Sequence, residues 1–497
     1  MEFSNPLLRG LYPDPSICKV GDTYYLVCST FEYWPAVPIF ASKNLVDWEQ
    51  IGNVLDRPGQ INLLDAEASQ GIFAPTIRFH NGLFYMVTTV TGPSSGEAPI
   101  SLTNFFVTAT DPAGPWSDPV VVDVDGIDPS LFWEDGNAYM QYAGRGKIMQ
   151  VRIDDVTGEV LEGPRLLTTG CGGRDVEGPH MWVRDGWYYL LMAEGGTREG
   201  HHVTMMRGKD VWGPFEPSPH GPVAINRDLR VPVQRVGHAD WVVGPDGDDY
   251  LVLLGVREVS HRSLLGRETM LCHASWTQDG WLIADGQHVA ASWDCALKGA
   301  AEDDWSFELD MEQHEMPSRI VSPRTPNRSF YQMGAGVLYM TGNGHGLRSG
   351  DSCCWGVRQP EFDVRMRTVV DMSLLGSEED EIGLAILSTN KSHLSIFLTL
   401  REGKTVVAVR RSVLDIEDVK VFTLDGLEKD VELAIDGSRS AYRFSVNGIE
   451  LMETPTAHVT VENAGTQNTG VIDCLFVSGE ARAQLSAFEV AVKEGSK

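Results

Sequence analysis

The sequence lacks any apolar run long enough to cross a membrane. A spanning helix needs about 20 predominantly apolar residues, and polar or charged residues interrupt every apolar stretch of this chain well before that length. The first thirty residues also lack the basic start, apolar middle and small-residue cleavage site of a signal peptide. We therefore expect no membrane partner and a cytoplasmic location.

Cysteine and positive charge are both scarce. The eight cysteines are scattered along the chain without a C-x-x-C pair, which argues against a disulfide scaffold and against a cysteine metal site. Lys and Arg number 40 against 69 Asp and Glu, so the net charge of the 497 residues is −29. Because such a field repels phosphate backbones, nucleic acid is not expected as a partner.

Sustained helical periodicity is absent from the first 300 residues, where a five-fold repeat is found instead. Each copy has a polar or Pro-containing start, an apolar segment, a Gly/Asp/Asn turn and an aromatic-rich apolar segment, which is typical of a β-hairpin. The copies are DPSICKVGDTYYLV from Asp14, APTIRFHNGLFYMV from Ala74, DPSLFWEDGNAYMQY from Asp128, GPHMWVRDGWYYLLM from Gly178 and ADWVVGPDGDDYLVLL from Ala239. They begin about 49 to 61 residues apart, enough for a four-stranded blade, so we predict a five-bladed β-propeller over residues 1–300.

The repeat stops in a small, polar stretch at residues 285–303, which we interpret as a linker. From 304 to 497, short alternating runs such as FDVRMRTVVDM and HLSIFLTL are separated by turn signals. This pattern predicts a β-sandwich as the second domain of an all-β chain. The sequence leaves open whether the chain forms a homo-oligomer.

Three of the five repeats carry an acid at their start, namely Asp14, Asp128 and Glu177. A single Asp-Pro is ordinary turn chemistry with a solvated side chain. In a propeller, however, equivalent starts of different blades face one central channel, so the three carboxyl groups would meet there. Because mutual repulsion and burial are costly, this clustering predicts a shared catalytic site.

Two carboxyl groups whose surroundings separate their pKa values can act as general acid and general base, and hydrolysis of a bond between sugars needs such a pair. A third acid held anionic nearby would raise the pKa of the proton donor. Aromatic rings can cover the apolar faces of a sugar, although most are core residues. The rings near the repeat starts are Tyr12, Phe31, Tyr33, Trp34, Phe73 and Trp182.

Eight segments resemble, in order, the signature segments of glycoside hydrolase family 43, especially its β-xylosidase branch. They are NPLLRGLYPDPSI, GIFAPTIRFHNGLFYMV, GIDPSLFWEDG, GGRDVEGPHMW, LLMAEGGTREGHHVTMMRG, VWGPFEPSPHGPV, VGHADWV and LGRETML, which span about residues 5–272. The tail from residue 304 looks like the C-terminal β-sandwich of that branch, with weaker motif support.

The resemblance implies a propeller catalytic domain that hydrolyses glycosides with inversion at the anomeric carbon. It also implies roles for the three acids: Asp14 matches the general base, Glu177 the general acid, and Asp128 the acid that orients Glu177 and tunes its pKa. No cofactor is expected for this chemistry.

The resemblance adds four substrate-binding residues. His238 in GHAD matches a channel histidine that often lies beside water or a divalent cation, so a Ca²⁺ ion in the channel is one expectation and a hydrogen-bonded core histidine the other. Arg267 in GRET matches an arginine that contacts the sugar or the carboxylates, and Phe31 and Phe73 match rings of the terminal sugar pocket. Phe73 stands where the branch usually has Trp, which leaves the substrate open.

The resemblance implies an exo-acting β-D-xylosidase that removes xylose from the non-reducing ends of xylo-oligosaccharides. An α-L-arabinofuranosidase or a bifunctional enzyme is the alternative with the same chemistry. A carbohydrate-binding protein and a propeller scaffold for protein partners belong to other classes, and the three acids argue against both. A sandwich loop of the branch closes the pocket, and we expect the Gly-rich segment 342–360 to be that loop, the alternative being that the sandwich only packs on the propeller.

Overall fold

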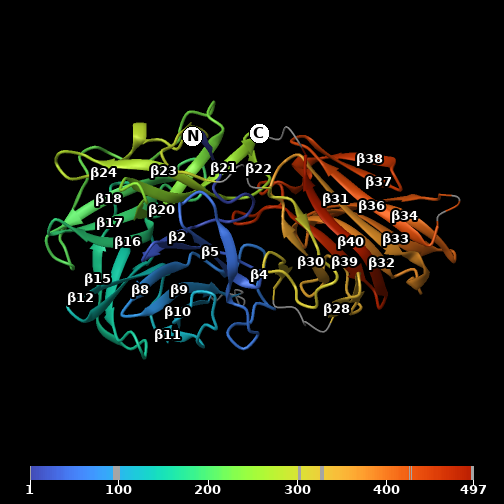
Figure 1. Cartoon of the computed structure of the whole chain (residues 1–497), viewed down its shortest axis with the longest axis horizontal. Helices are drawn as coiled ribbons and strands as arrows, with labels where there is room; N and C mark the ends of the chain where they lie inside the picture. Colours follow the sequence, from blue (N-terminus) through green and yellow to red (C-terminus); the bar gives the residue numbers. More distant parts are fainter. Residues whose placement is uncertain are drawn as a thin grey trace.

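The structure is a computed structural model that describes residues 2–92, 101–299, 304–324, 330–424, 426 and 428–493. Its regular elements are almost all strands, arranged in two bodies that lie side by side (Figure 1). The helical elements described are three short 3-10 turns, η1 (Asp285–Gln287), η3 (Met372–Leu374) and η4 (Thr456–Val459). In the described ranges no helix has the length and apolar character needed to cross a bilayer.

The first body contains five antiparallel sheets in chain order, drawn from blue to yellow-green in Figure 1. The first is built from β2 (Ser16–Val20), β3 (Thr23–Val27), β5 (Ala36–Ser42) and β6 (Glu49–Leu55). The second is built from β7 (Gly71–Ile72), β8 (Thr76–His80), β9 (Leu83–Thr91), β10 (Leu102–Ala109) and β11 (Val120–Val122).

The remaining three sheets of this body repeat the same order. The third contains β12 (Ile127–Glu134), β13 (Asn137–Ala143), β14 (Ile148–Ile153) and β15 (Val160–Thr168). The fourth contains β16 (Glu177–Arg184), β17 (Trp187–Glu194), β18 (His202–Gly208) and β19 (Phe215–Pro217). The fifth contains β20 (Val233–Val243), β21 (Asp249–Val259), β22 (Arg262–Ser263), β23 (Glu268–Trp276) and β24 (Leu282–Ala284).

The five sheets close into a ring around their first long strands. Contacts run from β2 to β8, β8 to β12, β12 to β16, β16 to β20 and from β20 back to β2. This is the arrangement of a β-propeller, in which the inner strands surround a central channel. The N-terminal strand β1 (Glu2–Ser4) pairs with β25 (Ser292–Asp294), so the ends of the body are joined.

The hairpin turns follow directly from the sequence repeat. In Asn81-Gly82, Asp135-Gly136 and Asp185-Gly186 both residues have positive φ, between 48° and 84°. This is the type I′ conformation, which matches the twist of two-residue hairpins and favours Asn-Gly and Asp-Gly. The turns therefore fix the register of β8 with β9, of β12 with β13 and of β16 with β17.

The second body is a β-sandwich of two large sheets, orange to red in Figure 1. One contains β28 (Tyr331–Gly334), β29 (Val337–Thr341), β40 (Arg482–Val492), β31 (Val364–Asp371), β36 (Asp430–Gly437), β37 (Ala441–Val446) and β38 (Ile449–Pro455), with β26 (Phe307–Glu308) on β40. The other contains β30 (Cys353–Arg358), β39 (Ile472–Ser478), β32 (Glu381–Thr389), β33 (Ser392–Arg401), β34 (Lys404–Val413) and β35 (Ile416–Phe422). The predicted all-β class with a C-terminal sandwich is confirmed.

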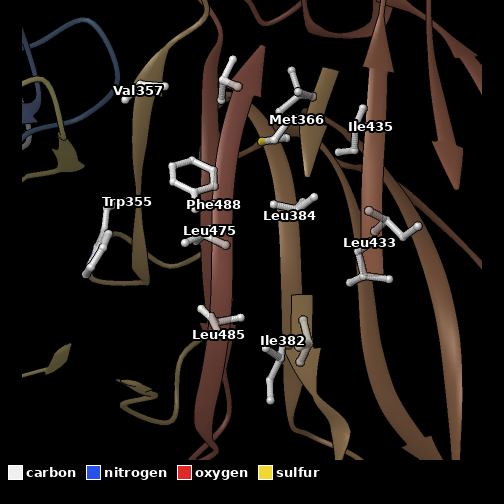
Figure 2. Close-up of a cluster of buried hydrophobic side chains, with 14 of the residues drawn as sticks. Trp355, Val357, Met366, Ile382, Leu384, Leu433, Ile435, Leu475, Leu485 and Phe488 are labelled. Atoms are coloured by element: carbon white, nitrogen blue, oxygen red, sulfur yellow. The ribbon is translucent and has the colours of Figure 1, made fainter. Parts of the chain in front are cut away.

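The core of the sandwich lies between its sheets. Figure 2 shows Leu433 and Ile435 of β36 and Phe488 of β40 among the side chains that fill it, and all three are fully buried. Full burial of such a side chain stabilises the fold by about 1.5–3 kcal/mol. The alternation of these residues with polar ones makes one face of each strand apolar.

The outer face of the six-stranded sheet packs on the propeller. Leu11 and Tyr33 of the first body share a buried cluster with Ile472 and Phe476 of β39. The short strand β4 (Tyr33–Trp34) also pairs with β27 (Ser322–Pro323), which follows the expected linker. Of that linker, η1 and β25 belong to the first body, and residues 300–303 lie outside the described residues, so the exact domain boundary stays a prediction.

Candidate active site

A cavity of about 330 Å³ opens at the channel, where several inner strands begin. Asp14 lies just before β2, Asp128 lies in β12 and Glu177 is the first residue of β16, so three different sheets supply the three acids. All seven side chains expected at the site line this one cavity: Asp14, Phe31, Phe73, Asp128, Glu177, His238 and Arg267. The ring thus brings together residues that lie far apart in the sequence.

The strand starts that carry the site share a local irregularity. Asp14, Asp128 and His238 have φ of 53°, 55° and 50°, which is left-handed backbone in residues that have a side chain. The strand pairing shifts register near Asp128, Glu177 and His238. Such bulges change the direction in which side chains point. A backbone conformation of this kind persists where the surrounding structure stabilises it, and it is found often at functional sites.

Asp14 is held as a carboxylate. Arg267 donates from Nη1 to Oδ1 at 3.0 Å and from Nη2 to Oδ2 at 3.2 Å, and Ser29 Oγ donates to Oδ2 at 2.5 Å. Burial raises the pKa of Asp14. The electrostatic effects of Arg267 and His238 and the hydrogen bond from Ser29 outweigh burial, so the pKa of Asp14 lies below its usual value. An anionic carboxylate of this kind can accept a proton from water.

Glu177 is shifted in the opposite direction. Burial and then the negative charge of Asp14 raise its pKa to about 7, against the opposing effect of Arg267. A carboxyl group with this pKa keeps its proton near neutral pH and can donate it. The cavity therefore contains one carboxylate and one proton donor.

Asp128 differs from the expectation of a simple anion. Its pKa lies well above the usual range because it is buried and close to Glu177 and Asp14. The Gly178 backbone N–H donates to Asp128 Oδ2 at 3.2 Å and partly offsets this rise. Asp128 and Glu177 therefore titrate as one coupled pair that retains a proton, and the sequence could not show this because it does not reveal burial.

His238 lies between two of the acids. Its Nδ1 is 3.8 Å from Asp14 Oδ1 and 4.0 Å from Asp128 Oδ2, and burial lowers its pKa. Calcium prefers six to eight oxygen ligands, and the described residues contain no group of three or more His, Cys, Asp or Glu side chains arranged to hold a metal. A calcium ion beside His238 therefore stays a prediction, and the proposed reaction does not depend on one.

The two phenylalanines form one wall of the cavity. The rings of Phe31 and Phe73 meet edge to face at 5.5 Å, and the Arg267 guanidinium lies 5.3 Å from the Phe31 ring. Four other rings considered from the sequence have structural roles away from the lining. Tyr12 packs on Phe40, Trp182 packs on Trp241, and Tyr33 and Trp34 lie in buried clusters.

The expectation for segment 342–360 is wrong. None of its residues lines the cavity, and its second half is strand β30. The C-terminal body instead contributes Gln467 and Asn468. Residues 467–468 carry no glycine-rich or repeat signal, so only the docking of the two bodies reveals them.

The segment that carries Gln467 and Asn468 is fixed to the propeller by polar contacts. The Asn468 backbone N–H donates to Ser69 Oγ at 3.1 Å, and Arg198 Nη2 donates to the Thr466 carbonyl at 3.3 Å. Arg235, only 5% exposed, pairs with Glu462 at 2.9 Å. The segment with Gln467 and Asn468 is therefore held in place and forms one wall of the cavity.

Sequence reasoning also missed Asp175, Thr197 and His201, which line the same cavity. Thr197 Oγ1 accepts a hydrogen bond from Arg267 Nη1 at 3.2 Å. Thr197 and His201 lie within GGTREGHH, one of the segments that carry the family resemblance, so a signal for them was present.

Comparison with known proteins places this geometry in a family. The model of glycosyl hydrolases family 43 matches residues 3–282, and the beta xylosidase C-terminal concanavalin A-like domain matches residues 310–490. The non-reducing end alpha-L-arabinofuranosidase BoGH43B of Bacteroides ovatus is 35% identical, covering 97% of this chain and 92% of its own. A xylosidase/arabinosidase of Butyrivibrio fibrisolvens is 36% identical, covering 88% and 87%.

Solved structures agree over the whole length. The Bacteroides ovatus protein titled xyloglucan PUL GH43B superposes with a TM-score of 0.93 at 34% identity, over 99% of this chain and 100% of its own. A xylan beta-1,4-xylosidase from Bacillus halodurans gives a TM-score of 0.90 at 26% identity, over 98% and 99%. The chain therefore belongs to glycosyl hydrolase family 43, a family of inverting glycoside hydrolases.

Proposed function

We propose that the chain is an exo-acting β-D-xylosidase that releases xylose from the non-reducing ends of xylo-oligosaccharides with inversion. The observation that carries the proposal is the meeting of Asp14, Asp128 and Glu177 from three sheets in one cavity. The opposite pKa shifts of Asp14 and Glu177 support a base and an acid. A binding protein without activity would have no need for this separation.

In this mechanism Asp14 is the general base. Its carboxylate accepts a proton from a water molecule as the water oxygen forms a bond to the anomeric carbon. Arg267 and Ser29 hold both carboxylate oxygens, which fixes the direction from which the water attacks. An inverting site separates base and acid by about 6.5–9.5 Å so that this water fits between them.

Glu177 is the general acid in the same step. Its proton passes to the glycosidic oxygen as the bond from that oxygen to the anomeric carbon breaks, so the alcohol leaves neutral. We assign Asp128 the role of orienting Glu177 and tuning its pKa, since the charge of Glu177 raises the pKa of Asp128 and the two carboxyl groups therefore influence each other's protonation. The products are free xylose of inverted configuration and a shortened oligosaccharide.

The exo preference is supported by the walls of the cavity. Phe31 and Phe73 can cover the apolar face of a terminal sugar, and Arg267 and His238 can bind its polar atoms. Gln467 and Asn468 add a wall from the second body. A cavity lined by both bodies favours removal of single end sugars over binding in mid-chain.

An α-L-arabinofuranosidase, alone or combined with xylosidase activity, is the second candidate. The relative BoGH43B, which matches nearly the full length, is named as such an enzyme. Phe73 stands where the xylosidase branch usually has Trp, so the ring pocket differs from that branch.

Release of nitrophenol from 4-nitrophenyl β-D-xylopyranoside and 4-nitrophenyl α-L-arabinofuranoside distinguishes the candidates. We expect the higher kcat/KM on the xyloside, with the product anomer followed by NMR to show inversion. Turnover of the arabinoside with negligible turnover of the xyloside would select the second candidate. A calcium ion, self-association and a cytoplasmic location stay predictions.

A further inference from the structure

His201 is a buried histidine of the cavity that the mechanism above does not use. It immediately precedes β18, lines the cavity together with Asp14, Thr197 and Arg267, and is only 2% exposed. Its Nδ1 lies 3.1 Å from the Arg235 carbonyl oxygen. A carbonyl can only accept a hydrogen bond, so Nδ1 carries the ring hydrogen.

This bond determines what the other ring nitrogen can do. Burial lowers the pKa of His201 to about 3, so the ring is neutral at ordinary pH. A neutral imidazole with its hydrogen on Nδ1 presents a lone pair on Nε2. Among the described residues, Nε2 is buried and has no hydrogen-bond partner. A buried acceptor without a donor is costly, and such a group in a native site calls for an explanation.

The ring is also held rigidly in its place. The Gly237 backbone packs closely against the ring. A Cβ at that position would come within 2.2 to 2.4 Å of the imidazole atoms, so a side chain there would displace the ring. Arg235, which accepts the Nδ1 hydrogen bond, is itself fixed by ion pairs to Glu258 at 2.7 Å and Glu462 at 2.9 Å. The His201 ring, which carries the acceptor Nε2, is therefore held in place by residues of both bodies.

A complementary donor is found on Arg267. Its two Nη atoms bind Asp14 and Thr197, whereas its Nε is buried and has no partner in the described part of the chain. A hydroxyl group can donate one hydrogen bond and accept another. A terminal xylopyranose carries such hydroxyl groups at C2, C3 and C4.

We propose that His201 is a substrate-binding residue whose Nε2 accepts a hydrogen bond from one hydroxyl of the terminal sugar. This rests on the proposed function, since it assigns a further contact to the same pocket. The site then rejects a sugar that lacks this hydroxyl, because Nε2 would again be left without a donor.

Two substitutions of His201 distinguish the role of Nδ1 from the role of Nε2. His201→Asn can keep a donor to the Arg235 carbonyl but has no acceptor at the position of Nε2. His201→Gln can place its amide oxygen near that position but loses the donor on the Nδ1 side. We expect His201→Asn to lower kcat/KM on 4-nitrophenyl β-D-xylopyranoside by about 10- to 100-fold, and His201→Gln to lower it less.

The decisive measurement is a double-mutant cycle with 4-nitrophenyl xylosides that lack the 2-, 3- or 4-hydroxyl in turn. For one of these, the loss caused by His201→Asn should largely disappear, because the contact is already missing, whereas for the other two the losses should multiply. Losses that multiply for all three would overturn the assignment, as would an unchanged kcat/KM in a folded His201→Asn protein.

Binding gives a second readout that does not depend on turnover. We expect D-xylose to raise the melting temperature of the wild-type protein, and to raise that of His201→Asn clearly less at the same concentration. Equal shifts in both proteins would contradict the contact. Failure of the proposed function is seen separately, as absence of turnover of either nitrophenyl glycoside by the wild type.

Discussion

Asp14 and Glu177 are both buried carboxyl groups, yet their surroundings shift their pKa values in opposite directions. Arg267 and Ser29 stabilise the anion of Asp14, whereas burial and the charge of Asp14 favour the protonated form of Glu177. The plot of rate against pH should therefore be bell-shaped. The rate falls at low pH because Asp14 becomes protonated, and it falls at high pH because Glu177 loses its proton.

Replacing either residue tests these roles. Asp14→Ala should lower kcat by at least about 100-fold on every substrate, since no group then accepts the proton of water. Glu177→Ala should cause a similar loss on xylobiose but a much smaller one on the nitrophenyl xyloside, whose leaving group needs little protonation. Steady-state kinetics on both substrates, with circular dichroism to verify folding, checks this. Equal losses of the Glu177 variant on the two substrates would contradict the acid role.

Asp128→Asn tests the coupling of the acid pair. With Asp128 present, loss of the last proton leaves two neighbouring negative charges, which raises the pKa of the pair. The neutral amide removes one of them, so the alkaline limb of kcat/KM should move to lower pH while the acidic limb moves little. A pH profile of the variant that keeps its alkaline limb would refute the tuning role.

How far the sequence predicts the site differs from residue to residue. The repeat located Asp14, Asp128 and Glu177 because their starts are equivalent, and the family resemblance added Phe31, Phe73, His238 and Arg267. The raised pKa of Asp128 could not be predicted, since it depends on full burial. His201 was not singled out, although it lies in GGTREGHH, one of the segments that carry the family resemblance.

At the scale of the single element, the start of β16 places Glu177 next to a glycine whose backbone is left-handed. Gly178, which follows the proposed general acid Glu177, has φ of 60°, and a Cβ there would lie 3.0 to 3.2 Å from the His238 ring. Its N–H also binds Asp128. The strand start therefore needs glycine for both its backbone and its close approach to His238.

Gly178→Ala and Gly186→Ala form a matched pair within this element. Gly186, in the turn after β16, has φ of 70°, but a Cβ there would meet nothing within 4 Å. Both variants should lose about 1 kcal/mol of unfolding free energy from the strained backbone. Only Gly178→Ala should also lower kcat, by about 10-fold or more, because His238 must shift near the reacting groups. Equal kcat in the two variants would show that this close approach is not needed.

Hairpins were the most predictable elements and irregular segments the least. The turns Asn81-Gly82, Asp135-Gly136 and Asp185-Gly186 are local features, so their residues determine their shape. Segment 342–360 was misjudged because glycine content indicates a loop but not what the loop contacts. Its strand β30 is defined by pairing with the distant strand β39.

At the scale of the molecule, the two bodies form one site and share a buried ion network. Arg257 of β21 binds Glu268 at 2.7 Å and Glu361 of the second body at 2.8 Å, and Arg9 binds Glu361 at 2.5 Å. Composition and repeats predicted a propeller and a sandwich, but not how they dock. Docking depends on such contacts between distant residues, and it supplies Gln467 and Asn468 to the cavity.

Glu361→Gln should show how strongly this network holds the molecule together. The Glu361 side chain is 1% exposed, so its replacement leaves Arg9 and Arg257 with less compensating charge in a buried place. Breaking one partner of a buried pair costs about 3–5 kcal/mol. We expect a clear loss of unfolding free energy in urea.

The control lies in the same sandwich. Glu453 pairs with Arg443 at 2.8 Å, but both side chains are about half exposed, at 50% and 51%. Solvent screens such a pair, so Glu453→Gln should change the unfolding free energy by no more than about 1 kcal/mol. If the sandwich wall of the cavity depends on docking, Glu361→Gln should also raise KM for the xyloside while Glu453→Gln leaves it unchanged. Similar stability and KM in the two variants would mean that apolar packing around Leu11 and Tyr33, rather than the ion network, fixes the position of the wall.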